Sequence, residues 1–209
     1  MSEARTPRAL ELSIGAAALF GVLLVLVSNI VVGERGLLGE VLYLLGFFTI
    51  WTNLAVAFVY TFGKRSAFIR GGTTTMIVMV GLVYHFMLSD GHSPDGALGT
   101  IGNLLTHYII PFAVTGDWLV FGPRRGTKWI WALLWPFFAL LYAVVAIARG
   151  SVTGFYSYPF LDINSLGVLG VAEELNTLMI AFAAAGLLVL AAARIIGHLR
   201  TVDADETRI

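Results

Sequence analysis

The sequence contains no cysteine among its 209 residues, and only 12% of them are charged. The lack of cysteine excludes disulfides, thiolate metal sites and a cysteine nucleophile. A soluble domain carries about 25% charged and roughly 45–50% apolar residues, whereas 58% of this chain is hydrophobic. This shortage of charge predicts an integral membrane protein, with lipid as its solvent.

The chain also has no surplus of charge of either sign. Thirteen Lys and Arg residues balance thirteen Asp and Glu residues, for a formal net charge of zero. No basic tract alternates with aromatic residues, so we expect no nucleic-acid partner.

Long apolar runs take the place of charge, and about 20 such residues are needed to cross a bilayer. The first run is too long for the apolar core of a signal peptide and is interpreted as a retained span. Short connections between the runs predict one domain over residues 1–209, an all-α integral membrane protein with a compact bundle of six transmembrane helices. The six predicted spans are Leu10–Val32, Val41–Phe62, Thr73–Ser89, Leu98–Phe121, Lys128–Ala148 and Leu166–Ile196.

Lys and Arg divide unequally between the two sides of such a bundle. The side that holds both termini carries eleven, including Arg70, and the opposite side carries only Arg35 and Arg149. Cytoplasmic loops are enriched in Lys and Arg. The asymmetry predicts a multi-pass protein of the inner (cytoplasmic) membrane with both termini cytoplasmic.

Polar residues inside the fourth span mark a candidate site, because polar side chains in a membrane helix are costly and often functional. Asn103 and His107 are four residues apart and share one helical face. Pro111 leaves the carbonyl of His107 without its helical partner and favours a kink there. The alternative is a buried histidine that ties two helices together by hydrogen bonds.

Thr49 in the second span is the candidate partner of His107. Counted from the outer ends of their spans, Thr49 lies roughly 12 Å deep and His107 roughly 14 Å deep. Asn53 shares a helical face with Thr49. A hydroxyl nucleophile needs an adjacent base, for which imidazole is the common choice. The alternative for Thr49 is a hydrogen bond to the carbonyl four residues earlier in its own helix.

At these residues the chain resembles a known family. Phe48-Thr49-Ile50, and the histidine of Leu105-Thr106-His107 before Ile110-Pro111-Phe112, are similar to motifs of the six-span superfamily that includes the androgen-induced proteins. Further similarity to its bacterial branch lies in Thr52-Asn53, Asp117-Trp118, Arg149-Gly150 and Tyr158-Pro159-Phe160-Leu161-Asp162. The animal members are membrane threonine hydrolases that cleave fatty acid esters of hydroxy fatty acids. The resemblance implies that Thr49 and His107 are the catalytic pair.

The predicted function is therefore an intramembrane lipid ester hydrolase in which Thr49 attacks and His107 acts as the base. Asn53 and Asn103 are candidate oxyanion donors or orienting residues. Thr52 supplies a second hydroxyl one turn from Thr49, so the choice of nucleophile between the two stays open. The rival prediction is a non-catalytic carrier that binds a lipid or another small molecule.

Five further residues are candidates for substrate binding. They are His85, Arg149, Tyr158, Asp162 and Glu173. Arg149 could anchor a fatty-acid carboxylate, and Tyr158 and Asp162 belong to a long last loop that could cover a cavity or simply connect two helices. His85 and Glu173 could instead meet water at the interface. His85, His107 and Glu173 lack the close spacing of zinc ligands, so we expect neither a metal nor a cofactor. The expected substrate is a membrane lipid or fatty-acid ester.

Overall fold

The computed structural model describes residues 6–62, 66–91, 94, 96–123 and 126–206, with the side chains of 200–206 left out. Every regular element within these ranges is a helix, and they contain no β-strand. The prediction of an all-α chain is confirmed.

The helices follow one another with short connections. The first half contains α1 (Arg8–Val32), α2 (Gly36–Leu44), α3 (Phe48–Phe62), α4 (Ala67–Val83), the π-helical turn η1 (Tyr84–Leu88) and the 3-10 turn η2 (Ser89–Gly91). The second half contains α5 (Gly96–Leu104), the π-helical turn η3 (Leu105–Ile109), α6 (Ile110–Phe121), α7 (Trp131–Leu134), α8 (Pro136–Thr153), the 3-10 turn η4 (Pro159–Leu161) and α9 (Ile163–Glu206).

Five helical stretches are long and apolar enough to cross a membrane, and a sixth is added if α2 and α3 count as one span. These two helices meet at 88°, so the straight span expected over Val41–Phe62 is broken. At the break the N–H groups of Gly46 and Phe47 bond to carbonyls only three residues earlier, those of Tyr43 and Leu44. Gly46 suits this corner because a side chain there would collide with the guanidinium of Arg149.

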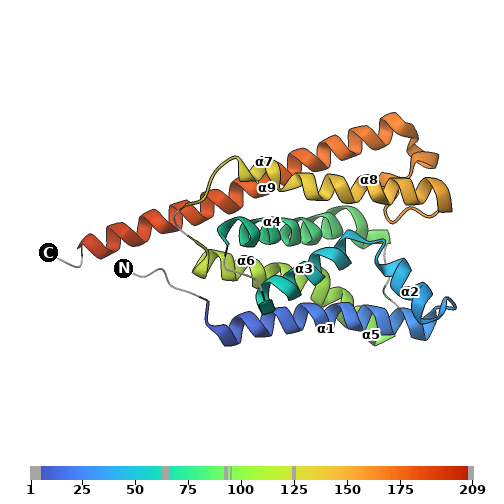
Figure 1. Cartoon of the computed structure of the whole chain (residues 1–209), viewed down its shortest axis with the longest axis horizontal. Coiled ribbons are helices and arrows are strands. Elements are labelled where there is room, and N and C mark those ends of the chain that lie inside the picture. The colour runs from blue at the N-terminus through green and yellow to red at the C-terminus, as the bar shows by residue number, and fades with distance from the viewer. Residues whose placement is uncertain (1–5, 63–65, 92–93, 95, 124–125, 207–209) are drawn as a thin grey trace.

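Helix α4 lies at the centre of the molecule, between α1, α3 and α6 on one side and α8 and α9 on the other (Figure 1). Half of its apolar stretch is buried, compared with a third in each of the other four long spans. It begins at Ala67, so Arg70 lies inside a helix rather than in the loop where the sequence pattern had placed it. A core of apolar side chains from α1, α3, α4 and α6 includes Ile14, Val56 and Ile77.

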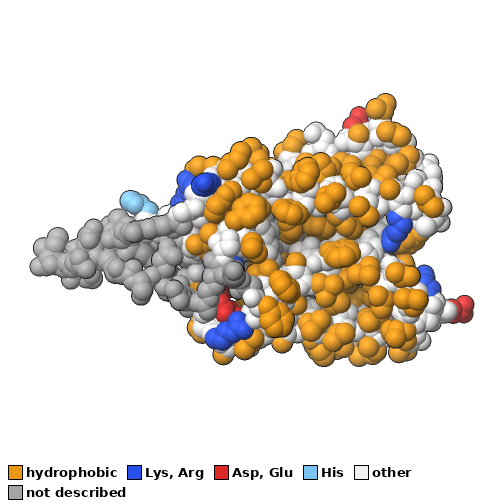
Figure 2. Space-filling view, viewed as in Figure 1, with side chains coloured by type: hydrophobic (Ala, Val, Ile, Leu, Met, Phe, Trp, Pro, Cys, Tyr) orange, Lys and Arg blue, Asp and Glu red, His pale blue; other side chains and the backbone are white. Residues whose placement is uncertain are grey.

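The surface is covered by exposed leucine, valine, isoleucine and phenylalanine side chains, while charged side chains gather toward the two ends (Figure 2). An exposed apolar surface of this extent marks contact with lipid or with another apolar partner. Helix α1 begins and α9 ends at the same end of the molecule (Figure 1). The helices could therefore cross a membrane as a bundle whose charged groups lie at its two faces.

Candidate active site

The structure brings the side chains of Thr49 and His107 together. The hydroxyl Oγ1 of Thr49 lies 3.3 Å from Nε2 of His107, and both residues are half-buried. Thr49 stands in the first turn of α3, directly after the break, and His107 stands in the π-helical turn η3. The pair therefore joins two irregular points of two different helices.

The position of Thr49 at the break leaves its hydroxyl available. Eight other described threonines donate to the carbonyl four residues earlier in their own helix: Thr52, Thr74, Thr75, Thr100, Thr106, Thr115, Thr153 and Thr177. For Thr49 the corresponding carbonyl belongs to Leu45, which accepts the indole N–H of Trp51 instead. The Thr49 hydroxyl is thus directed to His107, whereas the Thr52 hydroxyl is occupied within α3.

The surroundings of His107 define which ring nitrogen carries the proton. Its Nδ1 lies 3.2 Å from the backbone carbonyl oxygen of Asn103, and a carbonyl can only accept a hydrogen bond. Nδ1 is also 3.2 Å from the hydroxyl of Thr106, which itself donates to the carbonyl of Gly102. The carbonyl therefore favours the tautomer with its proton on Nδ1, and Nε2 presents a lone pair to Thr49.

The helix around His107 departs from regular α geometry, as Pro111 led us to expect. The turn Leu105–Ile109 is π-helical, and Pro111 follows at the start of α6. Single π-turns inside α-helices are frequent at functional sites. Gly81 of α4 faces this turn so closely that a methyl group there would meet the carbonyl of His107 at 3.1 Å. A residue without a side chain thus allows α4 to pack against the irregular turn.

Tyr84 holds the imidazole from its other side, and sequence reasoning did not select it. Its ring stacks on that of His107 with centroids 3.9 Å apart and planes 25° from parallel. Its hydroxyl accepts a hydrogen bond of 2.8 Å from the side-chain amide of Asn103. No spacing rule connects Tyr84 with His107, because the two residues belong to different helices.

The amide groups of both predicted oxyanion residues are committed elsewhere. Nδ2 of Asn53 donates to the carbonyls of Thr49 (2.9 Å) and Thr106 (3.2 Å). Nδ2 of Asn103 donates to Tyr84. The side-chain oxygens of the two asparagines are buried and have no hydrogen-bond partner in the described part of the chain, but an oxygen cannot donate to an oxyanion. Asn53 thus links α3 to η3, and Asn103 links α5 to η1.

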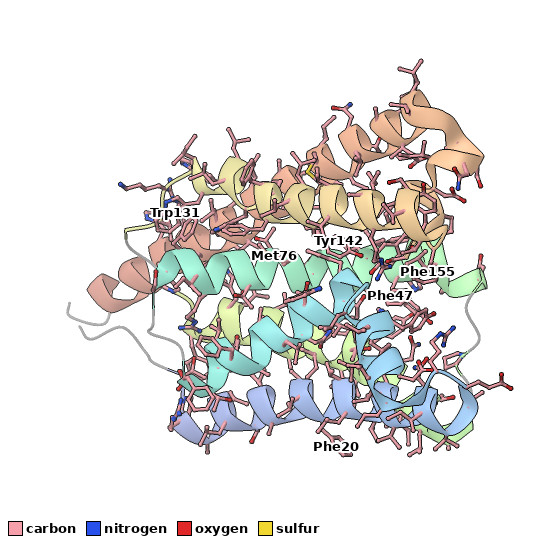
Figure 3. All side chains as sticks on the ribbon, turned by 45° about the vertical axis from the view of Figure 1, so that its right-hand side comes forward. Phe20, Phe47, Met76, Trp131, Tyr142 and Phe155 are labelled. Atoms are coloured by element: carbon pink, nitrogen blue, oxygen red, sulfur yellow. The ribbon has the colours of Figure 1, made fainter. Side chains whose placement is uncertain are left out.

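A cavity that is partly open to the outside begins at Thr49. Its walls come from α3, α4, η1, α8, the last loop and α9, and they are mostly apolar. The lining residues that carry a hydroxyl group are Thr49, Tyr84, Tyr142 and Tyr158. Figure 3 shows Tyr142 on α8 near Phe47, which follows α2. Such a lining fits an acyl chain, with Thr49 as a polar point in the wall.

Tyr158 comes from the last loop and is only 8% exposed. Burial raises the pKa of its phenol, while the Thr49 hydroxyl and the N–H groups of Phe48 and Thr49 act in the opposite direction. No hydrogen bond of 3.5 Å or less to the Tyr158 hydroxyl occurs among the described residues, and the side chain lines the cavity together with Thr49. The last loop thus contributes directly to the cavity, as a covering segment would.

Arg149 lies beside the break between α2 and α3 rather than in the cavity wall. Its Nη2 donates to Ser157 at 2.7 Å, and its guanidinium lies 5.0 Å from the ring centroid of Phe155, which is labelled in Figure 3. Its Nε is buried without a hydrogen-bond partner, and no carboxylate lies within 4 Å of it among the described residues. Arg149 is therefore a positive group close to the cavity that lacks a described anionic partner.

The other three predicted substrate-binding residues are not part of the cavity wall. His85 is exposed, with Nδ1 3.4 Å from the hydroxyl of Tyr108. Glu173 is exposed on α9. Asp162 accepts hydrogen bonds from the N–H groups of Asn164 and Ser165 and from the Ser165 hydroxyl, and so caps the start of α9.

Comparison with family models, curated proteins and solved structures finds no significant match for this chain. Within the ranges that the structure describes, no three His, Asp or Glu side chains gather in a way that could hold a metal ion.

Proposed function

We propose that this chain is an intramembrane hydrolase of the inner membrane that cleaves lipid esters, with Thr49 as nucleophile and His107 as general base. The observation that carries the proposal is the 3.3 Å contact between His107 Nε2 and Oγ1 of Thr49, a residue that lines an apolar cavity. The resemblance to the androgen-induced proteins adds the substrate class, fatty acid esters of hydroxy fatty acids.

In the first half-reaction Thr49 Oγ1 attacks the ester carbonyl carbon while its proton passes to Nε2 of His107. The protonated imidazole then gives that proton to the leaving alcohol oxygen as the carbon–oxygen bond breaks. Tyr84 and the carbonyl of Asn103 hold the ring throughout, from its face and from Nδ1. The product of this step is an acyl group esterified to Thr49.

In the second half-reaction a water molecule takes the place of the alcohol. His107 removes a proton from the water as it attacks the acyl carbon, and returns the proton to Thr49 Oγ1 as the acyl–oxygen bond breaks. Free fatty acid and unmodified enzyme result. The apolar walls would hold the acyl chain, and Arg149 would bind a free carboxylate on the hydroxy fatty acid portion.

A direct test uses purified protein in detergent with a panel of lipid esters that includes a fatty acid ester of a hydroxy fatty acid. We expect release of free fatty acid that depends on Thr49 and on His107. Binding of the ester without release of fatty acid would instead support a carrier. The apolar cavity is the observation that favours this second candidate. Equal release by the wild type and by Thr49→Ala would reject Thr49 as the nucleophile.

A further inference from the structure

Attack on an ester places a negative charge on the carbonyl oxygen, and hydrolases stabilise this oxyanion with preorganised hydrogen-bond donors. The amides of Asn53 and Asn103 donate to carbonyls and to Tyr84. Both N–H groups of Asn53 are thus used, and Asn103, which gives one of its two N–H groups to Tyr84, is not among the residues that line the cavity. A donor beside Thr49 therefore has to come from another group. The inference that follows rests on the proposed hydrolase function.

The Tyr158 hydroxyl meets the requirements for such a donor. Tyr158 is 8% exposed, lines the same cavity as Thr49, and forms no hydrogen bond of 3.5 Å or less among the described residues. Phe160 stacks on its ring at 5.0 Å with planes 7° apart, and Phe47 meets the ring edge to face at 5.8 Å. These rings hold the phenol in position before substrate arrives, which is what a preorganised donor requires.

The start of α3 lines the same cavity as Tyr158, through Phe48 and Thr49. Helix α3 begins at Phe48, and the first N–H groups of a helix have no acceptor within that helix. The positive end of the helix dipole also lies there, next to the nucleophilic hydroxyl. An oxygen bonded to the carbon that Thr49 attacks would lie between this helix start and Tyr158.

We propose that Tyr158 is a further catalytic residue, whose phenolic O–H and the backbone N–H of Thr49 together donate hydrogen bonds to the ester oxyanion. The phenol retains its proton throughout, so the step adds no proton transfer to the reaction. Because burial raises the pKa of the Tyr158 phenol, the group is a neutral donor at physiological pH. The last loop thus contributes to the chemistry and does not only cover the cavity.

The test is Tyr158→Phe, which removes the hydroxyl and keeps the ring stacked on Phe160. Loss of one oxyanion donor should lower kcat by roughly 10²- to 10³-fold and leave KM within a few fold. The matched control is Tyr156→Phe in the same loop, since Tyr156 is not among the cavity-lining residues and should keep wild-type kcat. A wild-type kcat for Tyr158→Phe, in an enzyme that depends on Thr49, would overturn this inference alone.

A second measurement separates an oxyanion contact from a general loosening of the loop. A long-chain trifluoromethyl ketone forms a tetrahedral adduct with a hydroxyl nucleophile, whereas an ether analogue of the substrate only fills the cavity. Tyr158→Phe should weaken binding of the ketone by about 10- to 100-fold, the range for a hydrogen bond to a charged group, with the ether unaffected. Equal weakening of both ligands would overturn the inference. If no ester is cleaved and the ketone binds Thr49→Ala as well as wild type, the proposed function fails and the inference fails with it.

Discussion

Thr49 owes its availability to its place in the chain rather than to its residue type. A threonine in the middle of a helix usually donates to its own backbone, as Thr52 does at 2.9 Å from the carbonyl of Phe48. The break at Leu45–Phe47 removes that option for Thr49, because the Leu45 carbonyl accepts from Trp51. The same hydroxyl group is therefore structural at position 52 and available at position 49.

Thr49→Ala should reduce ester hydrolysis on the order of 10⁴-fold or more, because no neighbouring atom can form the covalent intermediate. Thr49→Ser keeps the hydroxyl and should retain partial activity, since the lost methyl group loosens the side-chain rotamer. Free fatty acid release in detergent measures both effects, and thermal melting verifies that each variant is folded.

Thr52→Ala is the matched control for this series, with one threonine on the same helix changed to the same residue. It should lose little activity, because the Thr52 hydroxyl serves only its own helix. An inactive Thr52→Ala protein beside an active Thr49→Ala protein would move the nucleophile by one turn. Normal turnover by both would favour a water activated by His107.

His107→Ala should damage hydrolysis about as much as Thr49→Ala, because the two side chains act as a unit. The double variant should be little worse than either single variant. The measurement is again fatty acid release, with kcat compared across the three proteins. Additive losses in the double variant would show that the two residues do not share one step.

At the residue scale, the meeting of Thr49 and His107 could be expected from counted depth in the two spans. The acceptors of the two asparagine amides could not be predicted, because they include a carbonyl and a phenol from other helices. Asn53 reaches the Thr106 carbonyl on η3, and Asn103 reaches Tyr84 on η1. Spacing along one helix carries no information about such contacts.

At the scale of elements, the break between α2 and α3 is what hydropathy could not reveal. The residues from Val41 to Phe62 form one apolar run in the sequence, yet two helices meet there at 88°. Arg149 packs on Gly46, and Tyr142 and Ser157 both donate to the Gly46 carbonyl. The corner is thus held by α8 and the last loop, which are distant in sequence from it.

Helix α9 provides a prediction at this scale, because Asp162 caps its start. Asp162→Ala should lower the thermal stability of the protein, and Asp162→Asn should restore most of it, since asparagine is also a good N-cap. Turnover per folded molecule should stay unchanged in both variants. A large loss of turnover with normal stability would instead support the substrate-binding role predicted from the sequence.

The contribution of Asp162 should depend on pH with a defined sign. The hydrogen bond from Ser165 lowers the pKa of the Asp162 carboxyl below its usual range. The stabilisation is therefore complete above the unfolded-state pKa of about 3.9 and is lost as the pH falls through the lower folded-state value. The difference in melting temperature between wild type and Asp162→Ala should shrink only in that acidic range.

On the scale of the whole molecule, a buried polar cluster joins the N-terminal segment to three helices. Asp117 of α6 accepts hydrogen bonds from Thr6 (2.6 Å), from Tyr60 of α3 (2.7 Å) and from Arg70 of α4 (2.6 Å). The actual partner Arg70 could not be inferred, because its assignment to a loop concealed its place inside α4.

Asp117→Asn should destabilise the protein by about 3–5 kcal/mol, because it leaves the buried guanidinium of Arg70 uncompensated. Replacing both charges, as in Arg70→Leu with Asp117→Leu, should recover part of this loss. Unfolding in detergent measures Asp117→Asn, each single leucine variant and the double leucine variant against wild type. The ion-pair explanation would be contradicted if the double leucine variant lost more unfolding free energy than the two single leucine variants lose together.

Ion pairs change the count of Lys and Arg from which the orientation in the membrane is predicted. The charge of Arg70 is compensated by Asp117, as that of Arg8 is by Glu11 and that of Arg35 by Glu40. With these three set aside, nine Lys and Arg remain on the side of the termini and Arg149 on the other. The start of α1 and the end of α9 lie at one end of the molecule (Figure 1). Reporter fusions after Ser66 and after Arg125 should therefore read as cytoplasmic, and a fusion after Gly91 as periplasmic. A periplasmic reading after Arg125 beside a cytoplasmic one after Ser66 would contradict six crossings. Periplasmic readings at both positions would reverse the bundle and place Thr49 and His107 in the opposite half of the membrane.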